Sequence, residues 1–403
     1  MLKIAVIFHR LGPYHVARLN ATACDALETI TAIELSAKSS LYGWDPVDSG
    51  TNFNRVTVTA DDNKITTGQF KTKLAKVLDD LKPEVVFVSG WSGARAIEPL
   101  EWCLQNQVPA IVMSESSAKD AGRMKFVESL KSQVVAGFTA GLVGGTRHRE
   151  YLSSLGMPMD AIQCGYDAID NHYFEEQSIQ ARIEQSNVRV RLNLPERYFL
   201  TSSRFVVKKN LPSILVAFSE YVAQASSPHH LVMLGDGPLR DELFDLARQL
   251  NLEKLVHFPG FRQYHDLPSY YALATAFIHA SRVEQWGLVV NEAMACGLPV
   301  VVSDACGCSP ELVHDNVNGF SFSPNDTARL AEIMGFLANN ETKCQEFGVS
   351  SRRIISDWGT ERFAAGFWKA IRIAENAPPK RRTLARRFFL SLASWASQYS
   401  RVE

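Results

Sequence analysis

Short apolar segments alternate along the chain with longer segments in which apolar residues recur every three or four positions. This alternation is typical of βαβ units, in which helices connect the parallel strands of one sheet. In the first half of the chain it predicts strands at residues 4–8, 32–35, 85–88, 110–113 and 142–144. Between these strands it predicts helices at residues 15–28, 71–81 and 124–133.

The alternation stops in a polar segment at residues 175–190, which we interpret as a connector with room for some helix, and then starts again. The second series predicts strands at residues 198–202, 230–234, 256–258, 276–279 and 300–303. Its predicted helices lie at residues 211–221, 239–250, 289–296, 327–337 and 362–373.

Two series of βαβ units predict two domains, because a chain of 403 residues is too long for one ordinary core. The predicted fold class is α/β, with two Rossmann-like, doubly wound parallel-sheet domains facing a central cleft. We place the N-terminal domain at residues 1–180 and the second domain at residues 190–360. Residues 361–403 are expected to form C-terminal helices that end in a basic amphipathic tail.

The tail at residues 380–399 combines clustered basic residues with apolar residues at helical spacing. The basic residues are Lys380, Arg381, Arg382, Arg386 and Arg387, and the apolar ones are Leu384, Phe388, Leu392, Trp395 and Tyr399. One interpretation is an interfacial helix attracted to anionic lipid, which would make the protein peripheral to the inner face of the membrane. The alternative is a terminal helix that packs on the protein's own surface.

Charge, apolar segment length and cysteine content exclude several classes of protein. The formal net charge of −1 gives no basic field for nucleic acid, so no nucleic-acid partner is expected. No apolar segment approaches the roughly 20 residues that span a bilayer. The seven cysteines are scattered and include no Cys-x-x-Cys pair, which is typical of reduced thiols in the cytoplasm. We therefore expect a cytoplasmic protein.

The most informative segment is residues 281–301, SRVEQWGLVVNEAMACGLPVV, which follows a predicted strand and opens a helix. The backbone amides near Gly287, Leu288 and Val289 would be free to bind an anion, and the helix dipole favours one. Glu284 would lie in the loop and Glu292 about one turn inside the helix. Two carboxylates in these places can address different parts of one ligand, at the strand ends where ligands of open α/β sheets bind.

This segment resembles the Glu-x7-Glu signature of the family-4 (group 1) retaining glycosyltransferases, which have the GT-B fold. Further blocks of the chain are similar to that family in the same order, at residues 201–210, 231–240, 256–262, 267–272 and 318–320. The resemblance covers most of residues 198–325. It implies a nucleotide-sugar donor as co-substrate, with no separate cofactor.

The resemblance also implies roles for individual residues. Arg204 and Lys209 would grip the donor diphosphate, whose negative charge grows as the glycosidic bond breaks. Glu292 would bind the nucleotide ribose, Glu284 would approach the donor sugar, and the backbone near Arg262 would meet the base. Gly235 lies in a Gly-Asp-Gly turn that either touches the ligand or is only a turn. The chain contains no Asp-x-Asp pair, so the expected site uses no metal.

The first domain departs from the family pattern. After the first strand the family has a loop that commonly carries two adjacent glycines, where this chain has Gly12 alone, followed by His15 at a helix start. His15 is a candidate catalytic residue, although a structural role is the commoner one for such a histidine. Many family members also place a histidine after the fourth strand, where this chain reads Ser114-Glu115-Ser116. Whether His15 or Glu115 takes part in catalysis stays open.

The sequence thus predicts a retaining, hexosyltransferase-type glycosyltransferase. It would move a sugar from a nucleotide-sugar donor to a saccharide or lipid-linked saccharide acceptor in polysaccharide or glycoconjugate biosynthesis. Two alternatives keep the fold: a nucleotide-sugar epimerase, and a protein that binds sugar nucleotides without catalysis. A nicotinamide oxidoreductase lacks support, because no Gly-x-Gly-x-x-Gly follows the first strand.

Overall fold

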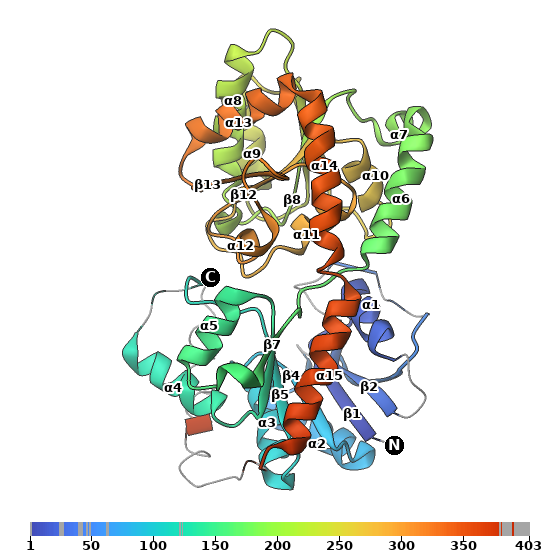
Figure 1. Ribbon diagram of the computed structural model, residues 1–403, viewed down its shortest axis with the longest axis vertical. Helices are drawn as coiled ribbons and strands as arrows, with labels where there is room; N and C mark the ends of the chain where they lie inside the picture. The colour runs from blue at the N-terminus through green and yellow to red at the C-terminus, as the bar shows by residue number, and fades with distance from the viewer. Residues whose placement is uncertain are drawn as a thin grey trace. The chain divides into compact units, whose positions relative to one another are not determined.

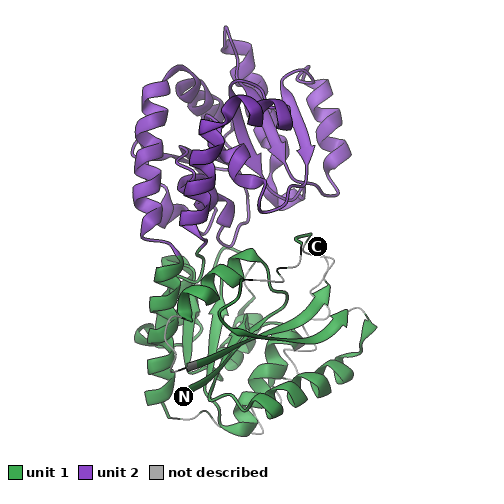
Figure 2. Cartoon of the chain, turned by 90° about the vertical axis from the view of Figure 1, so that its right-hand side faces the viewer, with its two compact units in different colours: residues 1–168, 360–403 green, residues 169–359 purple. Residues whose placement is uncertain are grey.

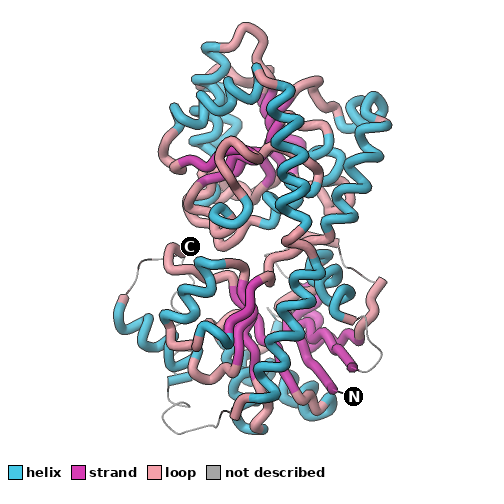
Figure 3. Tube along the Cα trace, viewed as in Figure 1, coloured by secondary structure: helices cyan, strands magenta, loops and turns pink. Residues whose placement is uncertain are grey.

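The structure is a computed structural model. It describes residues 2–23, 28–38, 43–45, 47, 50–61, 64–120, 122, 124–378, 380 and 389–390. The chain forms two compact units, of which unit 1 comprises residues 1–168 with 360–403 and unit 2 comprises residues 169–359 (Figure 2). Each unit is a parallel sheet covered by helices (Figure 3).

Unit 1 contains a seven-stranded sheet in the order β3-β2-β1-β4-β5-β6-β7, and every neighbouring pair is parallel. The strands are β1 (Leu2–Phe8), β2 (Glu28–Lys38), β3 (Asn54–Asp61), β4 (Val85–Ser89), β5 (Ala110–Ser114), β6 (Ala140–Val143) and β7 (Ile162–Cys164). The strand order reverses between β1 and β4, which is the doubly wound arrangement. Ligands of such sheets bind beyond the carboxyl ends of the strands at this reversal.

Helices cover both faces of this sheet. They are α1 (Pro13–Thr22), α2 (Thr67–Leu81), α3 (Ala94–Asn106), α4 (Lys125–Val135), α5 (Thr146–Ser154), the 3-10 turn η2 (Met159–Ala161) and α15 (Thr360–Asn376). Strand β1 shows why two apolar layers are needed. Its Ala5 and Ile7 join one buried cluster, while Ile4, Val6 and Phe8 join the other.

Unit 2 contains a six-stranded sheet in the order β10-β9-β8-β11-β12-β13, again with parallel neighbours. Its strands are β8 (Tyr198–Ser202), β9 (His230–Leu234), β10 (Val256–Gly260), β11 (Ala276–His279), β12 (Val300–Ser303) and β13 (Gly319–Phe322). The helices, labelled in Figure 1 where there is room, are α6 (Asn171–Ile183), α7 (Gln185–Leu192), η3 (Val207–Lys209), α8 (Leu211–Gln224), α9 (Arg240–Gln249), α10 (Leu267–Ala272), α11 (Leu288–Ala295), α12 (Ser309–Leu312), α13 (Thr327–Asn339) and α14 (Glu341–Ser356).

The unit boundaries differ from the domains placed on the sequence, because local polarity does not show where a helix packs. Unit 2 begins at residue 169, and the segment placed as a connector forms α6 and α7, whose Phe174, Ala181 and Val188 are buried. Helix α15 was assigned to a separate C-terminal region, but it belongs to unit 1 and lies along that sheet in Figure 1. There Phe367 stacks on Phe87 of β4, with 4.2 Å between the ring centroids.

The expected amphipathic tail at residues 380–399 lies almost wholly outside the described residues. Within the described part of the chain, no helix has both the length and the apolar character needed to cross a bilayer. The six cysteines that the structure describes form no disulfide with one another.

Candidate functional site

The carboxylate of Glu284 is the centre of a polar cluster at the carboxyl ends of β8 and β11. Lys209, the last residue of η3, forms an ion pair with Glu284 Oε2. His279, the last residue of β11, places Nε2 2.9 Å from the same oxygen. The hydroxyl of Ser281 donates to it at 3.3 Å. Three donors thus converge on Oε2, whereas Oε1 accepts no hydrogen bond from the described residues.

The loop that carries Glu284 is fixed by backbone hydrogen bonds on two sides. The Arg282 amide donates to the Lys208 carbonyl at 2.9 Å, which joins the loop to η3. The Gly307 amide donates to the Glu284 carbonyl, also at 2.9 Å, which joins it to the segment before α12. Lys209 and Glu284 are 75 positions apart in the sequence, and these contacts explain why they meet.

The cluster determines the protonation of its members. Burial by itself would raise the pKa of Glu284, but the positive charge of Lys209 and the hydrogen bond from His279 outweigh it and hold the pKa well below its ordinary value. Glu284 is therefore ionised at neutral pH. Burial lowers the pKa of His279 despite the hydrogen bond to Glu284. His279 is accordingly neutral, and its Nε2–H donates, because an ionised carboxylate can only accept.

The N-terminus of α11 lies beside this carboxylate. Gly287 precedes the helix with φ 105°, a left-handed conformation that side chains disfavour. A Cβ atom built on Gly287 would lie 3.3 Å from Glu284 Cγ and 3.7 Å from His279 Nε2. The amides of Leu288 and Val289 belong to the first turn, where helical amides have no intrahelical partner. Together with Lys209 they provide donors and positive potential for a phosphate.

The second carboxylate of the signature, Glu292, is enclosed rather than open. It has no exposed surface and lies inside α11, where its Oε2 accepts a hydrogen bond from the Tyr271 hydroxyl at 2.7 Å. The structure therefore places Glu292 on the same short helix as the amides of Leu288 and Val289 but does not present it to solvent.

The side chains of Arg204 and Arg262 form no hydrogen bond or ion pair with Lys209 or Glu284 in the described part of the chain. Arg204 is exposed in the loop after β8, and its side chain makes no hydrogen bond or ion pair with the part of the chain that the structure describes. Arg262, after β10, donates to the Pro259 carbonyl at 2.9 Å and lies over the Tyr270 ring. These arginines flank the strand ends without joining Lys209 and Glu284.

Gly235 has a packing role in bringing two of these loops together. Its amide donates to the Gly260 carbonyl at 3.0 Å, and a Cβ atom there would lie 1.8 Å from the Ser203 carbonyl oxygen. With φ at 130°, the position needs glycine for both space and conformation. The turn after β9 can therefore lie directly against the loop that carries Arg204.

The candidate residues of unit 1 lie at the carboxyl ends of β1 and β5. Gly12 is the N-cap of α1, and His15 turns back so that its Nδ1 accepts the Gly12 amide at 3.1 Å. Burial, followed by the charge of Arg18, lowers the pKa of His15 to about 3, so the ring is neutral. Glu115 directly follows β5 and is half-buried. No hydrogen bond or ion pair joins His15 and Glu115 among the described residues.

Sequence reasoning missed three residues of this site. His279 and Ser281 hold Glu284, and Tyr271 holds Glu292. The available signal was position, because His279 ends a predicted strand and Ser281 opens the signature loop.

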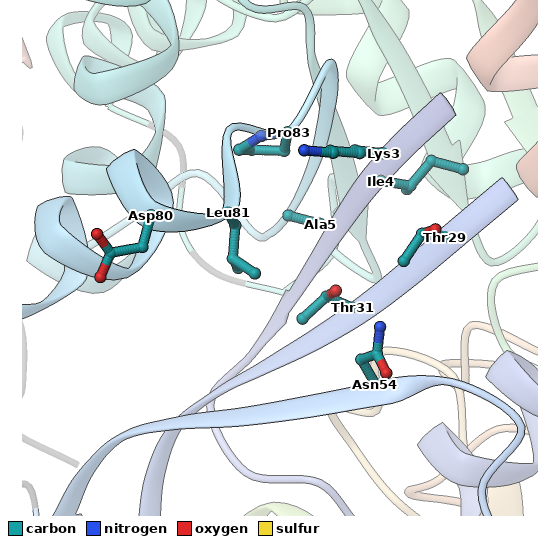
Figure 4. Close-up of a pocket in the computed structure, with 9 residues that line it drawn as sticks. All are labelled: Lys3, Ile4, Ala5, Thr29, Thr31, Asn54, Asp80, Leu81 and Pro83. Carbon is teal, nitrogen blue, oxygen red and sulfur yellow. The ribbon is translucent and has the colours of Figure 1, made fainter. Parts of the chain in front are cut away.

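Two further observations concern metal binding and a pocket away from these residues. Among the described residues, no group of three or more His, Cys, Asp or Glu side chains is arranged to hold a metal ion. A pocket in unit 1 lies at the opposite, N-terminal edge of the sheet, where Lys3, Thr31, Asn54 and Asp80 are among its lining residues (Figure 4). None of the residues expected to carry chemistry lines that pocket.

Comparison with known proteins identifies the unit that holds the cluster. Residues 183–353 match the family model of glycosyl transferases group 1. Most of unit 2 therefore resembles a group 1 glycosyl transferase domain, and we call it the group 1 domain. The match includes Lys209, Glu284 and Glu292 of this domain, together with the N-terminus of α11.

Relatives of the group 1 glycosyl transferase domain cover part of the chain. N-acetyl-alpha-D-glucosaminyl L-malate synthase of Bacillus anthracis is 26% identical over 226 residues, which is 56% of this chain and 55% of the relative. A GDP-mannose-dependent alpha-(1-6)-phosphatidylinositol monomannoside mannosyltransferase of Mycobacterium tuberculosis is 27% identical over 190 residues, 45% of this chain and 49% of the relative. The chain thus spans about half the length of these relatives.

The likeness to solved structures extends beyond the group 1 domain to nearly the whole chain. The crystal structure of HepE from Anabaena in complex with UDP has a TM-score of 0.71 and 16% identity, and the match covers 92% of this chain and 100% of HepE. Such a likeness shows the fold, which is the two-domain GT-B fold that the sequence predicted.

Proposed function

We propose that the chain is a retaining glycosyltransferase whose group 1 domain binds a nucleotide-sugar donor. The observation that carries the proposal is the cluster of Lys209, ionised Glu284 and the N-terminus of α11 at the carboxyl ends of parallel strands. The helix N-terminus and Lys209 suit the diphosphate, and we propose that Arg204, from the loop after β8, adds a second cation. The complex of HepE with UDP supports a nucleotide donor of this kind.

The ion pair with Glu284 gives Lys209 a defined position before the donor arrives. An ammonium group has three donors, and the pair with Oε2 leaves others for phosphate oxygens. A preorganised cation stabilises the charge that develops on the departing diphosphate without having to reorganise during the reaction. Glu284 Oε1, which accepts nothing from the described residues, is the atom available to a hydroxyl of the donor sugar.

The proposed reaction is a transfer on one face of the sugar. The bond between the anomeric carbon and the diphosphate oxygen breaks, and the acceptor oxygen bonds to the anomeric carbon from the same side. The acceptor proton passes to the departing phosphate, so no side chain has to serve as the general base. This leaves Glu284 a binding and positioning role, consistent with its depressed pKa.

We propose a saccharide or lipid-linked saccharide as the acceptor, bound by residues of unit 1. The Mycobacterium tuberculosis relative supports this class, since its name gives a phosphatidylinositol monomannoside as the molecule it acts on. A membrane-borne acceptor would also suit the basic tail at residues 380–399 as a peripheral anchor on the cytoplasmic side.

Calorimetry with UDP-, GDP-, ADP- and CMP-sugars tests the donor site. We expect one class of nucleotide sugar to bind, and Lys209→Ala to weaken that binding at least ten-fold. Lys208→Ala is the matched control, because Lys208 is exposed and forms no ion pair with the residues that the structure describes. If no nucleotide sugar binds, or if the two variants bind equally well, the proposed donor site is wrong. Conversion of the donor in the absence of an acceptor, followed by NMR, would indicate an epimerase instead.

A further inference from the structure

A second polar pocket lies in unit 2 at the edge of the sheet opposite the donor site. It is bounded by the segments that precede β8, β9, β11 and β12, and its volume is about 560 Å³. Pockets of this size hold small molecules. We call it the arginine pocket, after the residues Arg182, Arg189 and Arg197 that line it together with His229.

Among the described residues, the three guanidinium groups donate to neutral oxygens only. Arg182 donates to the Cys296 carbonyl and, at 3.2 Å, to the Ser178 hydroxyl. Arg189 donates to the Pro195 carbonyl. Arg197 donates to the Ser227 hydroxyl at 2.7 Å. Each guanidinium has five N–H donors, so each has donors beyond those in these hydrogen bonds.

Negative charge close to these arginines is scarce. Glu196 and Glu341 also line the pocket, but both are exposed, and neither forms an ion pair with an arginine within the part of the chain that the structure describes. Burial, followed by the charge of the nearby Arg352, lowers the pKa of Arg182. Arg352 does not line the pocket, and its Nε lies 3.9 Å from the Glu175 carboxylate. The lining of the pocket carries three arginines and two exposed glutamates, which leaves a net formal charge of +1.

His229 lines the same pocket as a buried polar residue. Its side chain is only 4% exposed, and its Nδ1 atom is buried without a hydrogen-bond partner. Burial and the charge of Arg197 lower its pKa to about 4, so the ring is neutral and has one donor and one acceptor nitrogen. His229 is therefore a neutral lining residue of the pocket, and its enclosed Nδ1 has no surface open to a ligand there.

The ordinary explanation covers only part of this arrangement. Arg182 binds the carbonyl of Cys296, the C-cap of α11, and arginines commonly stabilise helix C-termini in this way. That role accounts for one donor of Arg182. It leaves unexplained why Arg189 and Arg197 converge on the same pocket with no carboxylate partner.

We propose that the arginine pocket binds a phosphate group, either the free ion or the group of a small phosphate monoester. Guanidinium groups match phosphate oxygens in charge and geometry. Apolar residues such as Leu298, Pro299 and Leu337 line the remainder of the pocket and suit the organic part of a monoester. This site lies before the strands of unit 2, whereas the donor site lies after them, so one ligand does not fill both.

Titration calorimetry at constant ionic strength tests the proposal, with inorganic phosphate, glycerol 3-phosphate and ribose 5-phosphate as probes. We expect saturable binding of one probe molecule per chain, weakened at least ten-fold in the double variant Arg189→Gln/Arg197→Gln. Arg191→Gln is the matched control, since Arg191 is exposed on the same helix and does not line the pocket. Tighter binding of the esters identifies a monoester as the ligand, and equal binding identifies the free ion.

The proposal is overturned if no probe binds saturably, or if Arg191→Gln weakens binding as much as the double variant does. It is also overturned if Lys209→Ala abolishes binding while the double variant retains it, because the probe would then occupy the donor site. Circular dichroism checks that the variants fold. Arg197→Gln alone, at an exposed position, gives a second test with an expected weakening of about three-fold or more. These outcomes do not depend on whether the chain transfers a sugar.

Discussion

The Nε2 atom of His279 lies 2.9 Å from Glu284 Oε2, the same oxygen that pairs with Lys209. A neutral imidazole and a cation thus share one acceptor atom, and the second oxygen of Glu284 is left open. Glu284 therefore positions Lys209 through Oε2, and its Oε1 atom can accept a hydrogen bond from a ligand.

Glu284→Gln should change both stability and its pH dependence. The folded-state pKa of Glu284 is lowered, so its contribution to stability is present above the ordinary value of about 4.5 and is lost as the pH falls below it. We expect the variant to be less stable by about 1–3 kcal/mol at pH 7, since Lys209 loses its charged partner. Below pH 4.5 the difference should shrink.

Hydrogen exchange of peptides from β8 and β11 at pH 7, 5 and 3.5 measures this difference within unit 2. A constant difference across that pH range would contradict the ion pair. Glu332→Gln serves as the control, because Glu332 forms an exposed ion pair with Arg329 on α13.

Gly287→Ala should weaken donor binding and lower stability. The alanine would have to adopt φ near 105°, and its Cβ would press against Glu284 at 3.3 Å. We expect a cost of about 1–3 kcal/mol in unfolding free energy and at least a ten-fold loss of nucleotide-sugar affinity. Gly335→Ala, in α13, is the control: the nearest atom to its added Cβ is 3.9 Å away, and alanine suits a helix. Equal effects of the two substitutions would refute the role of Gly287.

Tyr271→Phe should destabilise unit 2 without changing its shape. The substitution removes the hydroxyl that donates to the buried Glu292 at 2.7 Å, and it leaves the aromatic ring in place. Removing one partner of a buried hydrogen bond costs about 1–3 kcal/mol. Chemical denaturation monitored by fluorescence gives the unfolding free energy. A variant as stable as the wild type would mean that this hydrogen bond contributes nothing net.

His15→Gln should flatten the acid response of unit 1. The pKa of His15 falls from 6.5 to about 3 on folding, so the unfolded chain takes up this proton first as the pH is lowered. Stability should therefore decline between about pH 6.5 and pH 3, and glutamine should remove that part of the decline. Glutamine also suits the third position of a helix as an acceptor for the N-cap amide. Hydrogen exchange of α1 peptides checks the result, and an unchanged decline would exclude His15 as its source.

Buried strands were the easiest elements to predict, for a physical reason. A strand covered on both faces reads as a continuous apolar run, and β8, β9, β11 and β12 were placed at the bounds that the structure shows. The edge strand β3, NRVTVTAD, is half exposed and polar, and it was missed. Helix α14 was also missed, because its sequence is largely polar and includes Gly348.

The residues of the candidate site also fall into those that the sequence predicts and those that it does not. Lys209 and Glu284 were found because their loops resemble a known signature, and they do meet in the structure. His279 was missed because its position at the end of a strand does not show which side chain the following loop brings to it. The packing of α15 on unit 1 was equally hidden, since the apolar face of Phe363 and Phe367 suits any complementary surface.

The return of α15 to unit 1 has a consequence for the order in which the chain is made. Unit 2 is continuous in sequence and can fold once residue 359 has left the ribosome. At that moment unit 1 still lacks α15, whose Phe363 and Phe367 belong to the apolar layer that covers β4 and β6. Its sheet is thus exposed during synthesis until the final helix emerges, and the first unit translated is the last to be completed.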